Sequence, residues 1–146
     1  MSPFSTSLST TTPINAAPAD VWRVLTDLPG YRDWNPYYRD AEGEVAEGQV
    51  VRLHAQLPGG RAAVSRCRVV RVDPVGELSW SSRLSVPGLM DTVHRFRLDR
   101  AVSGVTVLEQ HETLRGVLVP LSGSVVHQIR NGCTAMGEAL RQRVET

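Results

Sequence analysis

His94 and Glu112 are the two residues whose types and neighbours could support acid–base chemistry. His94 alternates with the apolar residues Phe96 and Leu98, so the three share one face of an expected strand. Glu112 alternates with Leu114 in the next such run. A carboxylate beside a histidine orients the imidazole and supports its protonated form. The pair is therefore a candidate acid–base site, and the alternative is a buried pair that only satisfies its own hydrogen bonds.

A short turn through Ser103 and Gly104 separates these two runs. Two strands joined by such a turn are expected to pair as an antiparallel hairpin. Counting back from the turn places His94 opposite either Gln110 or Glu112. Gln110 is therefore a second polar side chain that we expect at the site.

Three arginines of a neighbouring run could also take part. Arg66 and Arg68 share one strand face, and Arg71 lies on the other. An inward arginine could hold a ligand carboxylate or an enolate. We expect instead that all three side chains lie in solvent, as most arginines do.

The sequence predicts neither a metal site nor a cofactor. The four histidines show no metal-ligand spacing, and His111 and Glu112 are not followed by a second histidine at the fourth position. The glycines are scattered among turns, without a phosphate loop or a dinucleotide fingerprint. Cys133 is expected to be a small buried residue and not a nucleophile.

A long C-terminal helix, from Pro120 to about Val144, is the main element that must position these residues. Apolar residues recur along it at spacings of three, four, three and four, which describes one face of an α-helix. They are Val126, Ile129, Cys133, Met136 and Leu140. At ~1.5 Å per residue the helix is roughly 35 Å long. Gly132 and Gly137 each cost it ~1 kcal/mol relative to alanine. They indicate close packing, a bend or space for a ligand, with loose packing as the plain alternative.

The rest of the chain is predicted as one strand, two short helical segments and six further strands. A polar edge strand covers residues 4–14. Asn15 is expected to cap a short helix that has Pro18 in its first turn and ends at Pro29 and Gly30. Residues 31–38 are expected to form a second short helix or a turn. The six strands are expected at residues 39–45, 51–57, 61–72, 77–84, 91–98 and 105–115.

This order of elements predicts a single α+β domain over residues 1–146. Consecutive strands joined by tight turns pair antiparallel, and the C-terminal helix is the element long enough to cover the resulting seven-stranded sheet. A curved sheet around one helix leaves space that the helix cannot fill. We expect this cavity to open near Trp34 and Tyr38 and to bind a ligand among mostly apolar side chains. Those side chains are Leu53, Trp80, Phe96, Leu108, Val126, Ile129, Cys133 and Met136.

Composition argues against several classes of function. A net charge of +1 offers no surface for nucleic acid or for an anionic membrane. Two cysteines do not make a disulfide framework. The first residues lack the basic start and apolar run of a secretory signal, and no segment reaches the ~18 apolar residues of a membrane span. We therefore expect a cytoplasmic protein, whose oligomeric state these features do not determine.

Five runs of the sequence carry a family resemblance. They are INAAPADVWRVLTDLPGYRDWNP, VVRVDPVGELSW, HRFRLD, EQHETLRGVLVPL and AMGEALRQRVE. Together they resemble START-like domains of the SRPBCC superfamily, in the branch described as polyketide cyclase/dehydrase and lipid transport. The resemblance covers nearly the whole chain and implies the helix-grip fold, with a deep cavity between the sheet and the C-terminal helix. The matching positions are Trp34, Asn35, Pro36, Trp80, His94, Phe96, Glu112 and Gly116.

That family spans several functions, and three of them stay open here. The first is a cyclase or dehydratase for a polyketide-like molecule, with His94 as the acid–base residue and Glu112 orienting it. Trp34 and Trp80 would then stack on the rings of the substrate. The second is a non-catalytic carrier or sensor of a lipid or isoprenoid. The third is a protein-interaction domain whose cavity is filled by side chains. The apolar lining favours binding of a small hydrophobic molecule, with catalysis as an addition to it.

Overall fold

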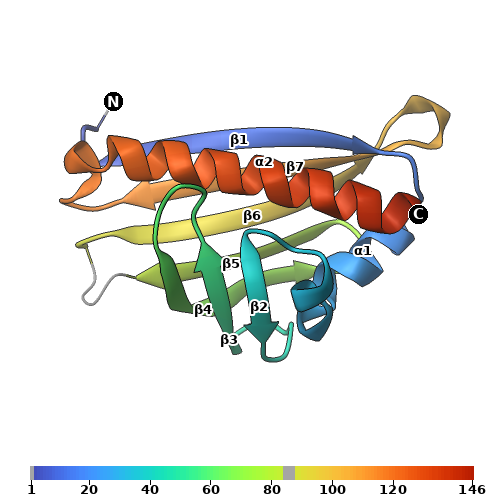
Figure 1. Cartoon of the computed structure of the whole chain (residues 1–146), viewed down its shortest axis with the longest axis horizontal. Helices are drawn as coiled ribbons and strands as arrows, with labels where there is room; N and C mark the ends of the chain where they lie inside the picture. The colour runs from blue at the N-terminus through green and yellow to red at the C-terminus, as the bar shows by residue number, and fades with distance from the viewer. Residues whose placement is uncertain (1, 84–87) are drawn as a thin grey trace.

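The protein folds as a curved antiparallel sheet that wraps around one face of a long C-terminal helix (Figure 1). The computed structural model describes residues 2–83 and 88–146. The strands are β1 (Ser5–Ile14), β2 (Tyr38–Glu42), β3 (Val50–Gln56), β4 (Ala62–Asp73), β5 (Glu77–Arg83), β6 (Asp91–Arg100) and β7 (Thr106–Arg115). The α-helices are α1 (Pro18–Thr26) and α2 (Gly123–Glu145), and the 3-10 helices are η1 (Leu28–Asp33), η2 (Val102–Gly104) and η3 (Val119–Leu121). The predicted helix-grip layout is confirmed.

The sheet is a meander of β2 to β7, and β1 pairs with β7 as the strand at that edge. Its order is β1-β7-β6-β5-β4-β3-β2, so each strand from β2 onward pairs with the next one in the chain. β1 pairs with β7, which places Leu8 beside Glu112. The prediction of an edge strand is therefore confirmed, since β1 pairs with one strand among the described residues, and it begins at Ser5, one residue later than predicted.

Alternation along the strands decides which side chains meet α2. In β3, Val51 and Leu53 are fully buried, whereas Arg52 between them is exposed. Successive side chains of a strand point to opposite faces of the sheet, so one face becomes apolar and the other solvated. Leu78 and Trp80 continue the buried face on β5.

The predicted stripe on α2 faces this core. Ile129, Cys133, Met136 and Leu140 are buried, and Val126 is half-buried at the start of the helix. The helix begins at Gly123 and not at Pro120, so the predicted start was wrong. Pro120 lies in the 3-10 turn η3 instead.

A hydroxyl holds the junction between η3 and α2. Ser122 Oγ donates to the Leu118 carbonyl at 2.7 Å, and the Ser122 N–H donates to the Val119 carbonyl at 3.0 Å. These bonds tighten the turn before the α-helical hydrogen bonds begin at the Ser122 carbonyl, which accepts from the Val126 N–H. The shift of the helix start therefore follows from local side-chain chemistry.

The two helix glycines permit close approach to the sheet, one of the predicted alternatives. A Cβ on Gly132 would overlap the ring of Tyr37, and a Cβ on Gly137 would overlap the hydroxyl of Thr12. Both glycines are buried. α2 therefore lies directly against β1 and against the segment that leads into β2.

Several boundaries differ from the sequence-based predictions. Ala17, and not Asn15, occupies the N-cap of α1, because Pro18 takes the first helical position. The Asn15 N–H donates instead to Glu145 Oε2 at 2.8 Å, next to the chain end that lies beside α1 in Figure 1. β2 ends at Glu42, three residues before the predicted end, because Gly43 adopts a φ of 123°. The predicted end of the fifth strand at Leu84 lies outside the described residues.

Neither α-helix of the described chain is both long enough and apolar enough to cross a lipid bilayer.

Candidate functional site

The candidate site is a row of three side chains that crosses β5, β6 and β7 on the buried face of the sheet. Trp80 lies opposite His94, and His94 lies opposite Glu112. The sequence predicted either Gln110 or Glu112 opposite His94, and the structure has Glu112 there. All three side chains are buried, with exposed fractions of 2%, 2% and 5%.

His94 is held at both ring nitrogens. The Tyr38 hydroxyl lies 2.7 Å from Nδ1, and Gln110 Oε1 lies 3.0 Å from Nε2. The amide nitrogen of Gln110 donates to the Cys133 carbonyl at 2.8 Å, so its oxygen must face the imidazole. A carbonyl oxygen only accepts, and therefore Nε2 carries the proton and donates to Gln110. Nδ1 is then the acceptor for the Tyr38 hydroxyl.

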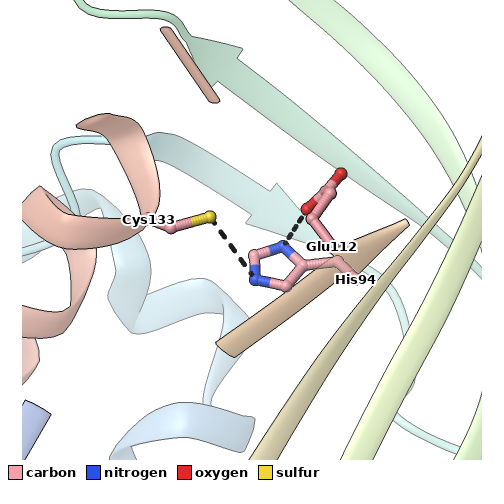
Figure 2. A group of neighbouring side chains, drawn as sticks. All are labelled: His94, Glu112 and Cys133. Carbon is pink, nitrogen blue, oxygen red and sulfur yellow. Dashed lines mark hydrogen bonds and ion pairs between the residues drawn. The ribbon is translucent and has the colours of Figure 1, made fainter. Parts of the chain in front are cut away.

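Glu112 approaches the same ring without forming a hydrogen bond to it. Its Oε2 lies 3.2 Å from His94 Nδ1, yet it has no hydrogen-bond partner among the described residues. Figure 2 marks this contact with a dashed line. The single lone pair of Nδ1 is already used by the Tyr38 hydroxyl. Tyr38 and Gln110, rather than Glu112, therefore orient the imidazole.

Burial decides the charge of this pair. Loss of water around His94 lowers its pKa to about 3, partly offset by the hydrogen bond to Gln110. The same loss of water raises the pKa of Glu112 to about 8. At neutral pH the imidazole and the carboxyl group are therefore both uncharged, and their 3.2 Å contact is not an ion pair. A neutral Glu112 carries a proton that it can donate.

A pocket of about 320 Å³ lies next to this row, between the sheet and α2. It is lined by Tyr37, Tyr38, Ala55, Leu57, Arg61, Ala63, Ser65, Cys67, Trp80, Ser82, Thr92, His94, Glu112 and Ile129. The lining combines apolar and aromatic walls with a few polar groups, which is the usual composition of a small-molecule site. The structure thus has a pocket between the sheet and α2, where the sequence predicted a cavity.

The structure divides the predicted site residues into two groups. Tyr38, Trp80, His94, Glu112 and Ile129 line the pocket. The others pack in or against the core outside its lining: Trp34, Leu53, Phe96, Leu108, Gln110, Val126, Cys133 and Met136. Gln110 and Cys133 nevertheless belong to the site, because they complete the hydrogen-bond chain from Tyr38.

The sequence analysis missed much of the lining, above all the inner face of β4 and the residue just before that strand. Arg61, Ala63, Ser65 and Cys67 all line the pocket. They alternate in the sequence, so they share one face of the strand. The sequence analysis did not recognise this face as part of a cavity because its residues are not large and apolar. The intervening Arg66 and Arg68 are exposed on the opposite face, as expected.

Three atoms of types that bind metals lie within 4.8 Å of one another, on the side chains of His94, Glu112 and Cys133. Figure 2 shows that the imidazole lies between the other two groups, with Glu112 at Nδ1 and Cys133 at Nε2. One ion cannot use both nitrogens of one ring at once. Burial also raises the pKa of the Cys133 thiol, which keeps it protonated. The group therefore does not fit a single metal ion.

Comparison with known proteins agrees with this architecture. A model of the family described as polyketide cyclase / dehydrase and lipid transport matches residues 5–145. A sequence comparison with curated proteins gives no match.

Three solved structures illustrate the likeness. The Zhui aromatase/cyclase from Streptomyces sp. R1128 is 22% identical, with 97% of this chain and 94% of that chain covered and a TM-score of 0.79. A START superfamily protein from Mycobacterium smegmatis is 19% identical, with 95% and 97% covered and a TM-score of 0.76. Norcoclaurine synthase from Thalictrum flavum is 13% identical, with 96% and 86% covered and a TM-score of 0.72. At these identities the likeness establishes the START-like fold.

Proposed function

Since this chain belongs to the polyketide cyclase / dehydrase and lipid transport family, we propose that it binds a small, largely apolar molecule in the pocket between its sheet and α2. The observation that carries this proposal is the pocket itself, with a volume of about 320 Å³. That volume lies at the lower end of the range for small-molecule sites, roughly 300–1,000 Å³. It suits a compound of two or three fused rings or a short isoprenoid.

The charge state of the site favours an uncharged ligand. His94 and Glu112 are both neutral at pH 7, because burial disfavours the charged form of each. Arg61 is the basic side chain of the lining, and it is exposed. A ligand can therefore keep a polar end near Arg61 while its apolar body contacts Tyr37 and Ile129.

Catalysis of a cyclisation or dehydration is a second candidate function. The observation that favours it is the chain of contacts from Tyr38 through His94 to Gln110, which begins at the pocket. A positioned acid–base group adds roughly two to four orders of magnitude to a rate, and orientation of a flexible substrate contributes more. The aromatase/cyclase among the similar structures supports this candidate at the level of the fold.

The binding proposal is tested by native mass spectrometry of freshly purified protein, followed by denaturing extraction. A retained polycyclic aromatic compound would favour the cyclase candidate, and an acyl chain or isoprenoid would favour a carrier. The neutral fluorescent probe N-phenyl-1-naphthylamine tests the empty protein. A protein that retains nothing and takes up no probe would contradict the proposal and favour a domain for protein interactions.

A matched pair of variants locates the bound probe. Ser65 lines the pocket, whereas the adjacent Val64 is 55% exposed on the opposite face of β4. We expect Ser65→Phe to weaken probe binding by about tenfold or more, ~1.4 kcal/mol, because the new ring occupies the pocket. Val64→Phe is expected to leave the affinity unchanged.

The catalytic candidate needs a separate assay. His94→Gln preserves a polar side chain of similar size while removing the imidazole. Retained ligand affinity together with lost turnover of a bound polyketide-like substrate would support a catalytic role for His94. Unchanged turnover would contradict that role and leave binding as the function.

A further inference from the structure

A hollow on the outer face of the sheet, opposite the face that α2 covers, is lined by three arginines. This basic hollow has a volume of about 340 Å³, and its residues come from β3, β4 and β5. They are Val50, Arg66, Arg68, Ser81, Ser82 and Arg83. The arginines are exposed and the serines are half-buried. Among the described residues, Ser82 alone lines both the basic hollow and the ligand pocket, so the two are separate features.

The strand register places the positive charges close together. Arg68 lies opposite Ser81, and Arg83 follows Ser81 by two residues on the same face of β5. Arg66 shares the outer face of β4 with Arg68 and lies directly opposite Arg52 of β3. Like charges that lie opposite each other destabilise a sheet. The fold therefore keeps an arrangement of charges that weakens it, which is typical of functional sites.

Ion pairs neutralise the other arginines on the outer face of these strands. The pairs are Arg52 with Glu42, Arg71 with Asp73 and Glu77, Arg95 with Glu109, and Arg97 with Asp99, all within 3.8 Å. Arg66, Arg68 and Arg83 form no ion pair with any residue in the described ranges 2–83 and 88–146. The unpaired arginines of this face are therefore the ones that line the basic hollow.

Two local contacts shape the cluster without neutralising it. Arg68 Nη1 donates to the Gly48 carbonyl at 2.9 Å, which holds the guanidinium in place and leaves its charge unpaired. Asp91 lies opposite Arg83, but its carboxylate accepts from the Gly88 N–H at 3.2 Å. The net charge of +1 is thus unevenly distributed, with a local excess of positive charge in the basic hollow.

A phosphate monoester matches this excess better than a carboxylate does. It carries a charge of about −1.5 to −2 at pH 7 and has three terminal oxygens. Guanidinium groups bind such oxygens through two parallel hydrogen bonds, and a serine hydroxyl can donate another. A carboxylate has two oxygens and a single charge, so it would leave part of the cluster unpaired. The carboxylates on the surrounding strands would repel an anionic bilayer, which favours a small soluble molecule.

We propose that Arg66, Arg68, Arg83 and Ser81 form a binding site for the phosphate monoester group of a small soluble molecule. The site lies on the face of the sheet opposite the ligand pocket, and it does not depend on the function proposed for that pocket. Bound phosphate cancels the repulsion among the arginines, so it should also stabilise the folded protein.

The experiment compares methyl phosphate with methyl sulfate by NMR titration of the full chain above pH 7. The two anions share a tetrahedral shape and three terminal oxygens, but methyl sulfate carries a single charge. We expect saturable shifts of the Nε–H signals of Arg66, Arg68 and Arg83 with methyl phosphate. Its affinity should exceed that of methyl sulfate by about threefold or more, the scale of one exposed charge pair, and it should fall as sodium chloride is added.

Variants of single arginines locate the bound anion. Arg66→Gln and Arg83→Gln should each weaken methyl phosphate binding by about threefold or more. Arg66→Lys keeps the charge without the planar fork and should retain part of the affinity. Arg97→Gln is the matched control, because it removes the same charge from the same face, outside the basic hollow, and should leave the affinity unchanged. Urea unfolding checks folding, and Arg66→Gln should be no less stable, since a like charge opposite Arg52 is lost.

Vesicles of phosphatidylcholine, with and without phosphatidic acid, test the alternative source of the same phosphate chemistry. We expect no difference in sedimentation of the protein between the two. Binding to phosphatidic acid that Arg66→Gln abolishes would overturn the assignment to a soluble molecule and indicate a membrane surface. Absence of saturable shifts with methyl phosphate, or an equal loss of affinity in Arg97→Gln, would overturn the site itself. Uptake of N-phenyl-1-naphthylamine should be the same in all variants, so neither result bears on the ligand pocket.

Discussion

Gln110 Oε1 lies 3.0 Å from His94 Nε2, and this contact determines which nitrogen of His94 carries the proton. The Gln110 amide cannot turn over, because its nitrogen donates to the Cys133 carbonyl of α2. A backbone carbonyl of the helix therefore sets the tautomer of a histidine on the sheet. The bare Nδ1 that results faces the Tyr38 hydroxyl at the pocket.

Replacing Gln110 with leucine is expected to destabilise the fold by about 1–3 kcal/mol, because the His94 N–H loses its acceptor in a buried place. The 15N chemical shifts of the His94 ring should also lose the pattern of a single Nε2–H tautomer. Urea unfolding and NMR measure the two effects. Gln142→Leu, at an exposed position of α2, is the control and should change neither. Unaltered His94 shifts in Gln110→Leu would contradict the assigned role of Gln110.

The stability of the protein should depend on pH in a way set by His94 and Glu112. The pKa of His94 falls from 6.5 to about 3 on folding, and that of Glu112 rises from 4.5 to about 8. Between pH 4.5 and 6.5 the unfolded chain binds an extra proton at His94, while the folded protein binds one at Glu112. These contributions cancel, so stability should be nearly level there.

Below pH 4.5 and above pH 6.5, the proton difference between the folded and the unfolded protein comes from one of these two groups. As the pH rises from 6.5 to about 8, the folded protein holds a proton on Glu112 that the unfolded chain has lost, so stability falls. As the pH drops from 4.5 to about 3, the unfolded chain binds a proton at Glu112 as well, so its extra proton on His94 is no longer offset and stability falls again. Each slope is limited to one proton, ~1.4 kcal/mol per pH unit.

Urea titrations between pH 3 and 9 measure this profile, and Glu112→Gln separates the two arms. The variant should lose the decline above pH 6.5, and its decline in acid should begin near pH 6.5 instead of 4.5, because Glu112 no longer offsets His94. The titratable groups that face Glu112 from the elements around it are Tyr37, Tyr38, Cys67, His94 and Cys133. Burial raises the pKa values of the tyrosines and cysteines among them, so they stay neutral in this range. An alkaline decline that persists in Glu112→Gln would assign it to another group.

Alanine at Gly132 or Gly137 should destabilise the protein, although alanine favours a helix by ~1 kcal/mol. The added methyl group would overlap the Tyr37 ring in one case and the Thr12 hydroxyl in the other. Overpacking of this kind costs typically 1–3 kcal/mol, which exceeds the gain in helix propensity. Gly123→Ala is the control, because a Cβ there meets no atom within 4 Å. Thermal unfolding measures all three variants, and a raised melting temperature for Gly137→Ala would be inconsistent with the close approach of α2.

Asn35 should support the site through the backbone that carries Tyr38. Its Oδ1 accepts from the N–H groups of Tyr37 and Tyr38, both at 2.9 Å, and the residue is only 4% exposed. Asn35→Ala is expected to cost about 1–3 kcal/mol, since two buried donors lose their acceptor. It should also weaken binding of the neutral probe by moving Tyr38.

Asn131→Ala provides the comparison, because Asn131 is exposed on α2 and alanine is a better helix former. Denaturant unfolding and probe titration of the two variants give both quantities. Equal stability of the two variants would show that the Asn35 side chain does not hold this segment in place.

Much of the architecture was determined by periodicity in the sequence. Alternation identified the strands and the faces of β3 and β5, and the three-four spacing identified the buried stripe of α2. Tight turns between consecutive strands then required an antiparallel meander. The same alternation placed His94 on the inner face and limited its partner on β7 to Gln110 or Glu112. These inferences succeed because strand and helix periods are local properties of the backbone.

The tertiary structure decided the partners and the charge of His94. Tyr38 reaches its Nδ1 from 56 residues away, and the Gln110 amide takes its orientation from a carbonyl on α2. The neutral state of Glu112 arises from burial among elements that are distant in the sequence. The sequence-based reading had a carboxylate supporting a charged imidazole, and that reading neglected the cost of placing charge in a dry interior. Hydrogen-bond geometry and desolvation depend on the packing of the whole domain, and no sequence pattern reports them.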